Sequence, residues 1–202
     1  MSFIHTIPPE QADGDVLAMY RRQQGPYGYL PNYAKVYCYR PDVMKAWAEL
    51  QAVIRRHIDR KTFELVTLAA ARAIDNSYCC LAHGKVLQNY YSVDELRAIL
   101  TDDPGAPISR AEHAMMRLAA KVARNSSAVS REEIAELQSL GVSDEAIFDI
   151  VAVAAARCFF GKIGDALGVE PDAPYAELDN GLRELLVVGR AIDTRSPEVL
   201  TD

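Results

Sequence analysis

The chain has 202 residues and a formal net charge of -6, and half of its residues are hydrophobic and a quarter charged. This is the composition of an ordinary globular protein long enough to bury a core, and its acidic balance does not favour nucleic acid or an anionic membrane as a partner. The N-terminus shows no signal-peptide pattern, and the longest apolar run, 150–156, is too short to span a bilayer. The cysteines are too few and too irregular for a secreted disulfide framework: Cys38, Cys79, Cys80 and Cys158. We therefore expect a cytoplasmic protein.

The first half of the chain carries one helical signal after another. Residues 10–24 predict a short helix, which the glycines and prolines of 25–33 interrupt. Apolar residues recur at helical spacing over 40–58, and good helix formers follow over 62–74. A polar cluster, Asp75-Asn76-Ser77, then offers both a stop and an N-cap, so that a further helix is expected over 78–91.

The second half is also predicted to be helical. Residues 101–107, "TDDPGAP", form the clearest break in the chain. Two capping boxes follow, one pairing Ser109 with Glu112 and one pairing Ser130 with Glu133. We find no series of strand patterns, and we predict an all-α protein.

Two further helices are expected near the C-terminus. The segment from 143 to 168 is rich in alanine and predicts a helix that packs closely in a core or a subunit interface. A linker over 169–179 precedes a short terminal helix at about 181–193.

Two thiols and an imidazole lie close together in "DNSYCCLAHG", residues 75–84. On a helix that turns about 100° per residue, Cys79 and His83 share one face with Val86 and Tyr90, while Cys80 lies nearer the margin of that face. Both thiols can reach His83, because they precede it by four and three residues.

The place of Cys79 in its predicted helix favours a reactive thiol. If Asn76 or Ser77 is the N-cap, Cys79 lies in the first turn, where the helix dipole lowers a thiol pKa. His83 then takes the proton or stabilises the thiolate as imidazolium. The alternative is that the cysteines pack as small hydrophobic residues.

At this point the sequence resembles a known family. The motif of the alkylhydroperoxidase D-like and carboxymuconolactone decarboxylase superfamily is Glu-x11-Cys-x-x-Cys-x-x-x-His. This sequence reproduces that spacing with Glu64, Cys79 and His83, and has Asn76 in place of the first cysteine. Upstream residues 30–50 resemble the peroxidase-related branch.

The resemblance implies an all-helical alkylhydroperoxidase D-like domain with an internally duplicated core. We expect a single domain over 1–178, with the resemblance strongest over 25–172, and a C-terminal helical extension over 179–202. Members of the family assemble as homo-oligomers, so a trimer or a hexamer is expected here, with a dimer as the alternative.

The family also implies a reaction. In its thiol peroxidases the cysteine next to the histidine attacks a hydroperoxide, the earlier cysteine resolves it and the glutamate relays a proton. Carried over, Cys79 is the nucleophile, His83 its proton partner and Glu64 the relay acid, with Cys80, Asn76 and Tyr78 as accessory residues. The expected partners are a small hydroperoxide and a thiol reductant, giving an antioxidant peroxidase.

Asn76 departs from the family pattern in a way that matters for the reaction. It cannot form a disulfide, so the resolving thiol is missing. Cys80 is adjacent to Cys79, but a vicinal disulfide inside a helix is strained. An external thiol is the remaining route, unless Cys38 or Cys158 approaches in space.

Other functions remain open at this stage. A lyase that acts on a small lactone acid would use His83 and Glu64 and leave Cys79 incidental, although no basic residue beside the motif marks a carboxylate site. A non-catalytic, redox-sensing oligomer is a third hypothesis. We expect no cofactor and no metal, because His5, His57 and His113 are scattered. Five tyrosines are candidates for lining a pocket over the thiol: Tyr27, Tyr29, Tyr33, Tyr37 and Tyr39.

Overall fold

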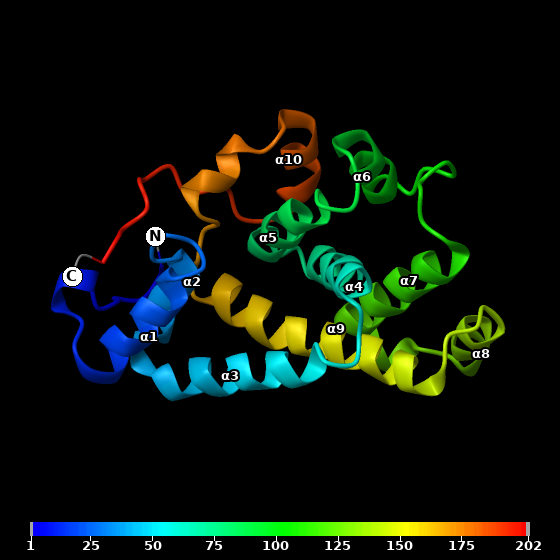
Figure 1. Ribbon diagram of the computed structural model, residues 1–202, viewed down its shortest axis with the longest axis horizontal. Helices are drawn as coiled ribbons and strands as arrows, with labels where there is room; N and C mark the ends of the chain where they lie inside the picture. The colour runs from blue at the N-terminus through cyan, green and yellow to red at the C-terminus, as the bar shows by residue number, and fades with distance from the viewer. Residues whose placement is uncertain (1, 201–202) are drawn as a thin grey trace.

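The computed structural model describes residues 2–200, and over this range the chain folds into α-helices and short 3-10 turns (Figure 1). The helices are α1 (Gly14–Gln24), α2 (Asn32–Val36), α3 (Pro41–Ile54), α4 (Arg60–Ala73), α5 (Ser77–Leu87), α6 (Val93–Leu100), α7 (Arg110–Asn125), α8 (Arg131–Ser139), α9 (Asp144–Ala166) and α10 (Asn180–Leu186). The only β-type pairing in the described range is an isolated antiparallel bridge between Leu30 and Glu198. The all-α prediction is confirmed.

Helix α4 lies at the centre of the molecule, where it contacts α5, α7 and α9. Every residue from 63 to 71 is buried, which is the pattern of a helix surrounded by protein on all sides. Leu65 and Leu68 belong to a core shared with α1, α3 and α5, whereas Phe63 and Val66 belong to a second core shared with α7 and α9. Glu64 lies on the same helix between these residues and is fully buried.

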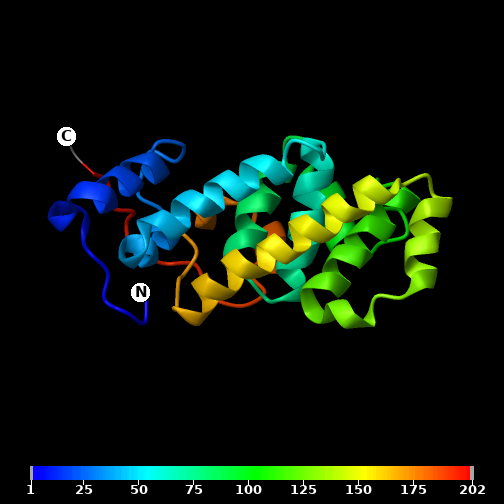
Figure 2. The same cartoon turned by 90° about the horizontal axis from the view of Figure 1, so that it is seen from below.

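The alanine-rich segment forms the longest helix, α9, which runs along α3 on one face of the molecule (Figure 2). Close packing was expected there, and Ala154 and Gly161 are indeed buried. A Cβ atom at Gly161 would lie 2.9 Å from Ile74 Cδ1 and 3.4 Å from Asn76 Cγ. The glycine therefore lets α9 pass directly against the turn between α4 and α5.

That turn is short and well defined. Asp75 adopts a left-handed conformation, with a φ of 55°, and ends α4. Asn76 begins α5 as its N-cap, because its side-chain oxygen accepts a hydrogen bond from the Cys79 backbone N–H at 2.7 Å. The predicted N-cap is confirmed, and it places Cys79 in the first turn of α5.

Several boundaries differ from the sequence-based expectation. Helix α6 was not predicted, although Ser92 and Glu95 form a capping box at its start. The expected break at 25–33 is slightly shorter than predicted, because α2 begins at Asn32 with Pro31 as its N-cap residue. The terminal helix expected over 181–193 stops at Leu186, since the chain then turns so that Gly189 N–H donates to Ser77 Oγ at 2.7 Å.

The C-terminal segment packs onto the rest of the chain. Leu182 and Leu186 are fully buried and belong to the first core, where α10 contacts α5 and α6. Leu200 N–H donates to the Gln24 side chain at 2.7 Å, which attaches the last described residue to α1. The division at residue 178 and the internal duplication stay predictions.

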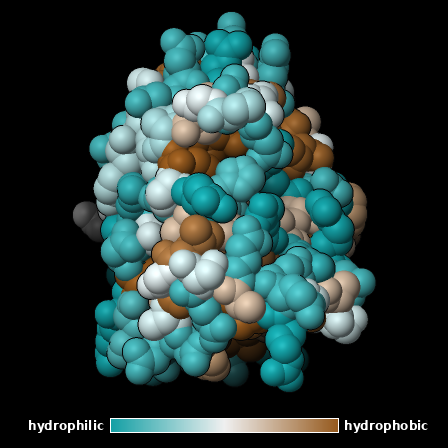
Figure 3. Space-filling view, turned by 90° about the vertical axis from the view of Figure 1, so that its right-hand side faces the viewer, coloured by the Kyte–Doolittle hydropathy of each residue, from teal (hydrophilic) through white to brown (hydrophobic). Residues whose placement is uncertain are grey.

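The end of the molecule formed by α7, α8 and the loop after α6 presents a largely hydrophilic surface with apolar side chains between the polar ones (Figure 3). Between residues 2 and 200, none of the helices combines the length and the apolar character needed to cross a membrane.

Candidate active site

Cys79 lines a cavity of about 320 Å³ between the end of α1, α2, α3, α5 and α9. The cavity is lined by Gln23, Tyr27, Tyr33, Met44, Trp47, Ala48, Gln51, Ala52, Arg55, Tyr78, Cys79, Ala82, His83, Arg157 and Phe160. Its aromatic wall is a stack, because Trp47 and Phe160 lie with ring centroids 5.3 Å apart and an interplanar angle of 15°. The size suits a small organic molecule.

Glu64 and His83, which the motif spacing paired, are in direct contact. His83 Nδ1 is hydrogen-bonded to Glu64 Oε2, and the second carboxylate oxygen of Glu64 accepts from Arg60 Nε at 2.5 Å. Burial alone would raise the pKa of Glu64, but the hydrogen bond from His83 and the hydrogen bond and positive charge of Arg60 lower it on balance. Glu64 is therefore ionised, which fixes the Nδ1–H tautomer of His83.

His83 is neutral in this setting. Burial is the largest cause that lowers its pKa, to about 4, and the charge of Arg157 adds to this despite the opposing effect of Glu64. Because Nδ1 donates to Glu64, Nε2 carries a lone pair and can accept a proton. His83 can thus serve as a base at neutral pH, within the same cavity as Cys79.

The Cys79 thiol has a partner that the sequence analysis did not identify. Arg157, from the middle of α9, donates from Nη1 to Cys79 Sγ at 3.4 Å, and both side chains are buried. Burial raises the pKa of Cys79, and Arg157 opposes that effect only in part. The expected low pKa of Cys79 is therefore wrong for the resting protein, because desolvation outweighs the favourable position at the helix start.

Arg157 was identifiable in principle as the one basic residue between 144 and 161, in an otherwise apolar stretch. A buried cation needs contacts that replace water, and Arg157 finds them in the Cys79 sulfur and in the rings of Trp47 and Phe160, whose centroids lie 5.9 and 5.7 Å from its guanidinium. Arg55, at the end of α3, also lines the cavity. No basic residue beside the motif marked a carboxylate site in the sequence, whereas the folded cavity contains Arg55 and Arg157.

Replacement of Arg157 by glutamine is expected to slow the oxidation of Cys79 by cumene hydroperoxide about tenfold to a hundredfold. The reason is that a charged hydrogen bond to the sulfur is worth about 1.5–3 kcal/mol. The rate can be followed by stopped-flow fluorescence, using Trp47 as the reporter. The matched control is Lys162→Gln, which removes an exposed cation from the same helix. Equal rates in both variants would show that Arg157 only fills space.

The accessory residues fall into different places. Tyr78 lines the cavity and donates its hydroxyl to Asp172 Oδ2. Cys80 lies off the helix face that carries Cys79 and His83, does not line the cavity and is fully buried. The reason is that α5 is enclosed on several sides, as Leu81 and Leu87 show by being fully buried too.

The tyrosine prediction holds for two of the five residues. Tyr27 and Tyr33 line the cavity. Tyr29 instead donates to Asp172 Oδ2 at 3.3 Å, and Tyr39 is 52% exposed and donates to the His5 carbonyl at 2.8 Å. Tyr37 is buried and stacks on Phe160 at a centroid distance of 6.2 Å.

Asn76, which replaces the first cysteine of the family motif, has a structural role that uses its whole amide. Its oxygen caps α5, while Nδ2 donates to Asp165 Oδ2 at 2.7 Å and to the Gly161 carbonyl at 3.3 Å. The side chain is buried and joins the start of α5 to α9.

Asn76→Ala is expected to lower the free energy of unfolding by about 3 kcal/mol, of which about 1 kcal/mol is the lost cap and the rest the buried polar groups left without partners. Chemical denaturation would measure this. Asn89→Ala, which removes an exposed amide just after α5, is the control and is expected to change stability by less than about 0.5 kcal/mol. A loss below about 1 kcal/mol for Asn76→Ala would contradict this role.

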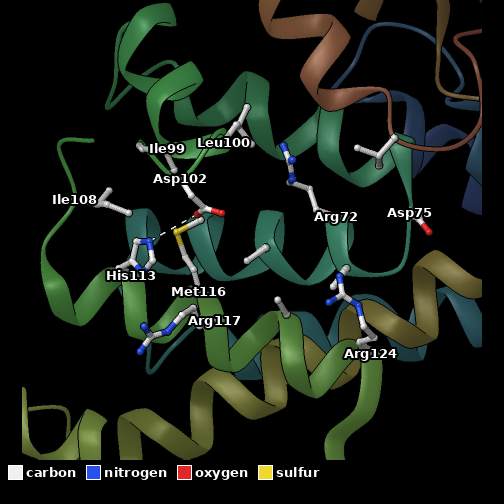
Figure 4. A pocket seen from close by; sticks show the side chains of 14 residues that line it. Arg72, Asp75, Ile99, Leu100, Asp102, Ile108, His113, Met116, Arg117 and Arg124 are labelled. Carbon is white, nitrogen blue, oxygen red and sulfur yellow. Dashed lines mark ion pairs between the residues drawn. The ribbon is translucent and has the colours of Figure 1, made fainter. Parts of the chain in front are cut away.

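A second cavity, of about 360 Å³, lies between α4, α6 and α7 (Figure 4). It is lined by Arg72, His113 and Arg124 among others, and an ion pair joins His113 to Asp102 at 3.7 Å. Neither Cys79 nor Glu64 nor His83 lines it. Over the described residues no group of three or more histidine, cysteine or acidic side chains could hold a metal ion.

The part of the chain that contains Glu64, Cys79 and His83 matches a protein-family model. Residues 41–115 match the model of the carboxymuconolactone decarboxylase family, a range that contains Glu64, Cys79 and His83. No protein of curated function matches the chain at a significant level.

Solved structures share the fold at low sequence identity. A peroxidase-related protein with an alkylhydroperoxidase AhpD core from Ralstonia eutropha JMP134 is 22% identical with a TM-score of 0.73, over 86% of this chain and 94% of its own. A peroxidase-related protein from Silicibacter sp. TM1040 is 22% identical with a TM-score of 0.70, over 85% and 92%. The debrominase Bmp8, in a cysteine-to-alanine variant bound to 2,3,4-tribromopyrrole, is 18% identical with a TM-score of 0.68, over 92% and 98%.

The resemblance is confirmed for the fold and for part of the chain: residues 41–115 match the carboxymuconolactone decarboxylase family model, and the all-helical fold is that of the alkylhydroperoxidase AhpD core.

Proposed function

We propose that the protein is a thiol-dependent, peroxidase-related oxidoreductase that reduces an organic hydroperoxide with Cys79 as nucleophile. The observation that carries the proposal is that Cys79 lines a cavity together with His83, a potential proton acceptor, and Arg157, which donates a hydrogen bond to the Cys79 sulfur. Peroxidase-related proteins of similar fold support the general class of chemistry.

The first step is proton transfer from the thiol. His83 Nε2 takes the proton of Cys79, and Glu64 stabilises the resulting imidazolium through Nδ1. Arg157 stabilises the thiolate that forms. The raised pKa of Cys79 means that the thiolate is produced in the presence of this base and this cation rather than stored.

The second step is oxygen transfer. The Cys79 sulfur attacks the terminal oxygen of the hydroperoxide, a sulfur–oxygen bond forms and the oxygen–oxygen bond breaks. The departing alkoxide takes the proton from His83 and leaves as an alcohol, so that Cys79 becomes a sulfenic acid. The aromatic wall formed by Trp47 and Phe160 favours a hydroperoxide with an apolar or aromatic group.

One observation favours a second function. The two charged side chains in the cavity, Arg55 and Arg157, could hold the carboxylate of a small lactone acid, with His83 and Glu64 as proton-transfer groups. In that lyase-like reaction Cys79 would be incidental.

Similarity in fold to a debrominase suggests a third reaction, reductive debromination. Bmp8 is a debrominase with a bound brominated pyrrole, and the stacked aromatic wall here would accept a planar ring. A redox-sensing role without turnover is the remaining alternative.

Three separate assays of the purified protein discriminate between these functions. The first contains cumene hydroperoxide with excess dithiothreitol, the second carboxymuconolactone, and the third 2,3,4-tribromopyrrole with dithiothreitol. Catalytic loss of the hydroperoxide, with carboxymuconolactone and the pyrrole unchanged, is the expected result. Decarboxylation of the lactone or release of bromide in place of hydroperoxide loss would overturn the proposal. Oxidation of Cys79 without turnover would support the sensor.

A further inference from the structure

The proposed reaction leaves Cys79 as a sulfenic acid, and its return to the thiol needs a reductant. Of the residues that line the cavity, Cys79 is the only cysteine. All four cysteines are free, and Cys80 is fully buried in the same helical turn, where a disulfide to Cys79 would strain the helix. The amide of Asn76, at the family's resolving position, is fully used in hydrogen bonds to α5 and α9. The reductant must therefore enter through the cavity.

The entrance to the cavity is defined by the exposed members of its lining. Ala48 and Ala52 on α3 and Arg55 at its C-cap follow one another at helical spacing and are exposed, and Tyr27, which lines the same cavity, is 41% exposed. Cys79 itself is 2% exposed. A cavity of about 320 Å³ over a buried sulfur admits a small molecule more readily than the surface of a folded protein.

The charge of the cavity indicates which small molecule it accepts. Its charged lining residues are Arg55 and Arg157, none of the described lining residues is acidic, and His83 is neutral. The nearest carboxylate, Glu64, is 3.8 Å from Arg55 Nη2 and is already bonded to Arg60 and His83. Arg55 is 43% exposed, and its guanidinium lies 4.5 Å from the centroid of the Phe63 ring, which holds the side chain beside the entrance.

We propose that the entrance is a binding subsite for a low-molecular-weight thiol that bears a carboxylate, and that Arg55 binds this carboxylate. The inference rests on the proposed function. The small thiolate attacks the Cys79 sulfur, the sulfur–oxygen bond breaks, and the hydroxide leaves as water with one proton. A second thiolate then attacks the small-molecule sulfur of the mixed disulfide, which releases Cys79 as the thiolate and a small disulfide.

The test separates the two half-reactions. Cys79 is first oxidised with one equivalent of cumene hydroperoxide, and its reduction is then timed with 3-mercaptopropionate, 2-mercaptoethanol and cysteamine, with rates expressed per thiolate because the thiol pKa values differ. The native protein is expected to react fastest with the anionic thiol and slowest with the cationic one. Arg55→Gln should slow the anionic thiol by about tenfold and the neutral thiol by less than about twofold.

Two further variants serve as controls. Arg56→Gln removes the neighbouring exposed cation, which does not line the cavity, and should leave all three rates unchanged. Arg55→Lys should restore part of the preference for the anionic thiol. Mass spectrometry with limiting thiol should show 3-mercaptopropionate bound to Cys79.

The failures can be told apart. If Cys79 forms no sulfenic acid, the proposed function falls and the subsite with it. If the sulfenic acid forms but its reduction is insensitive to thiol charge, or if a disulfide between Cys79 and Cys80 forms instead of the mixed disulfide, the subsite is refuted while the peroxidase proposal stands.

Discussion

Replacement of Cys79 by serine is expected to lower hydroperoxide turnover by at least about a thousandfold, because a hydroxyl group is a far weaker nucleophile than a thiolate and forms no sulfenic acid. Serine keeps the size of the side chain and can still accept the hydrogen bond from Arg157, so that the cavity stays intact. The measurement is the steady-state loss of cumene hydroperoxide with excess dithiothreitol.

The matched control for this substitution is Cys80→Ala. Cys80 is as buried as Cys79 but lies outside the cavity, and alanine leaves no unpaired hydroxyl in the core. Its turnover should stay within about threefold of the native value at a temperature where both proteins are folded. A loss of similar size in both variants would mean that the cysteines matter for packing and not for chemistry.

The second large effect is expected from His83→Gln, and it should appear in the pH dependence as well as in the rate. In the proposed reaction the proton passes from Cys79 to His83 within the site, so the reacting state has the same net protonation as the resting protein. The rate of Cys79 oxidation should therefore rise as His83 loses its proton near its pKa of about 4 and then stay level through neutral pH.

Without the imidazole, only thiol that has lost its proton to solvent can react. Because burial raises the pKa of Cys79, the thiolate fraction then increases about tenfold per pH unit throughout the neutral range. At pH 7 the variant should be slower than the native protein by about 10²–10⁴-fold. Stopped-flow rates between pH 5 and 9 would test this, with His57→Gln, an exposed histidine outside the cavity, as the control. Parallel pH profiles for the native protein and His83→Gln would contradict the role of His83 as base.

Much of the fold could be predicted from local sequence signals. Capping boxes at Ser109 and Ser130 begin α7 and α8, and the N-cap at Asn76 begins α5, as expected. These signals work because they act within one helical turn. The end of α10 at Leu186 could not be predicted, because it depends on the contact between Gly189 and Ser77, residues far apart in the chain.

The site also combines contacts that the sequence pattern indicates with contacts between residues far apart in the chain. The contact between Glu64 and His83 followed from the family spacing, and the structure brings the two side chains together. Arg157 lies 78 residues beyond Cys79 and meets it only because Gly161 lets α9 approach the start of α5. The raised pKa of Cys79 also depends on burial by several elements, which no local pattern contains. The family spacing therefore pointed to the proposed nucleophile and base but not to the groups that set their pKa values.

The most direct test of the account is to trap sulfenic acid on the native protein. The protein is treated with one equivalent of cumene hydroperoxide in the presence of dimedone, and the peptide that contains Cys79 and Cys80 is fragmented in a mass spectrometer to assign the adduct. A rapid adduct on Cys79 alone is expected. An adduct confined to Cys80, or no adduct on either cysteine, would contradict it.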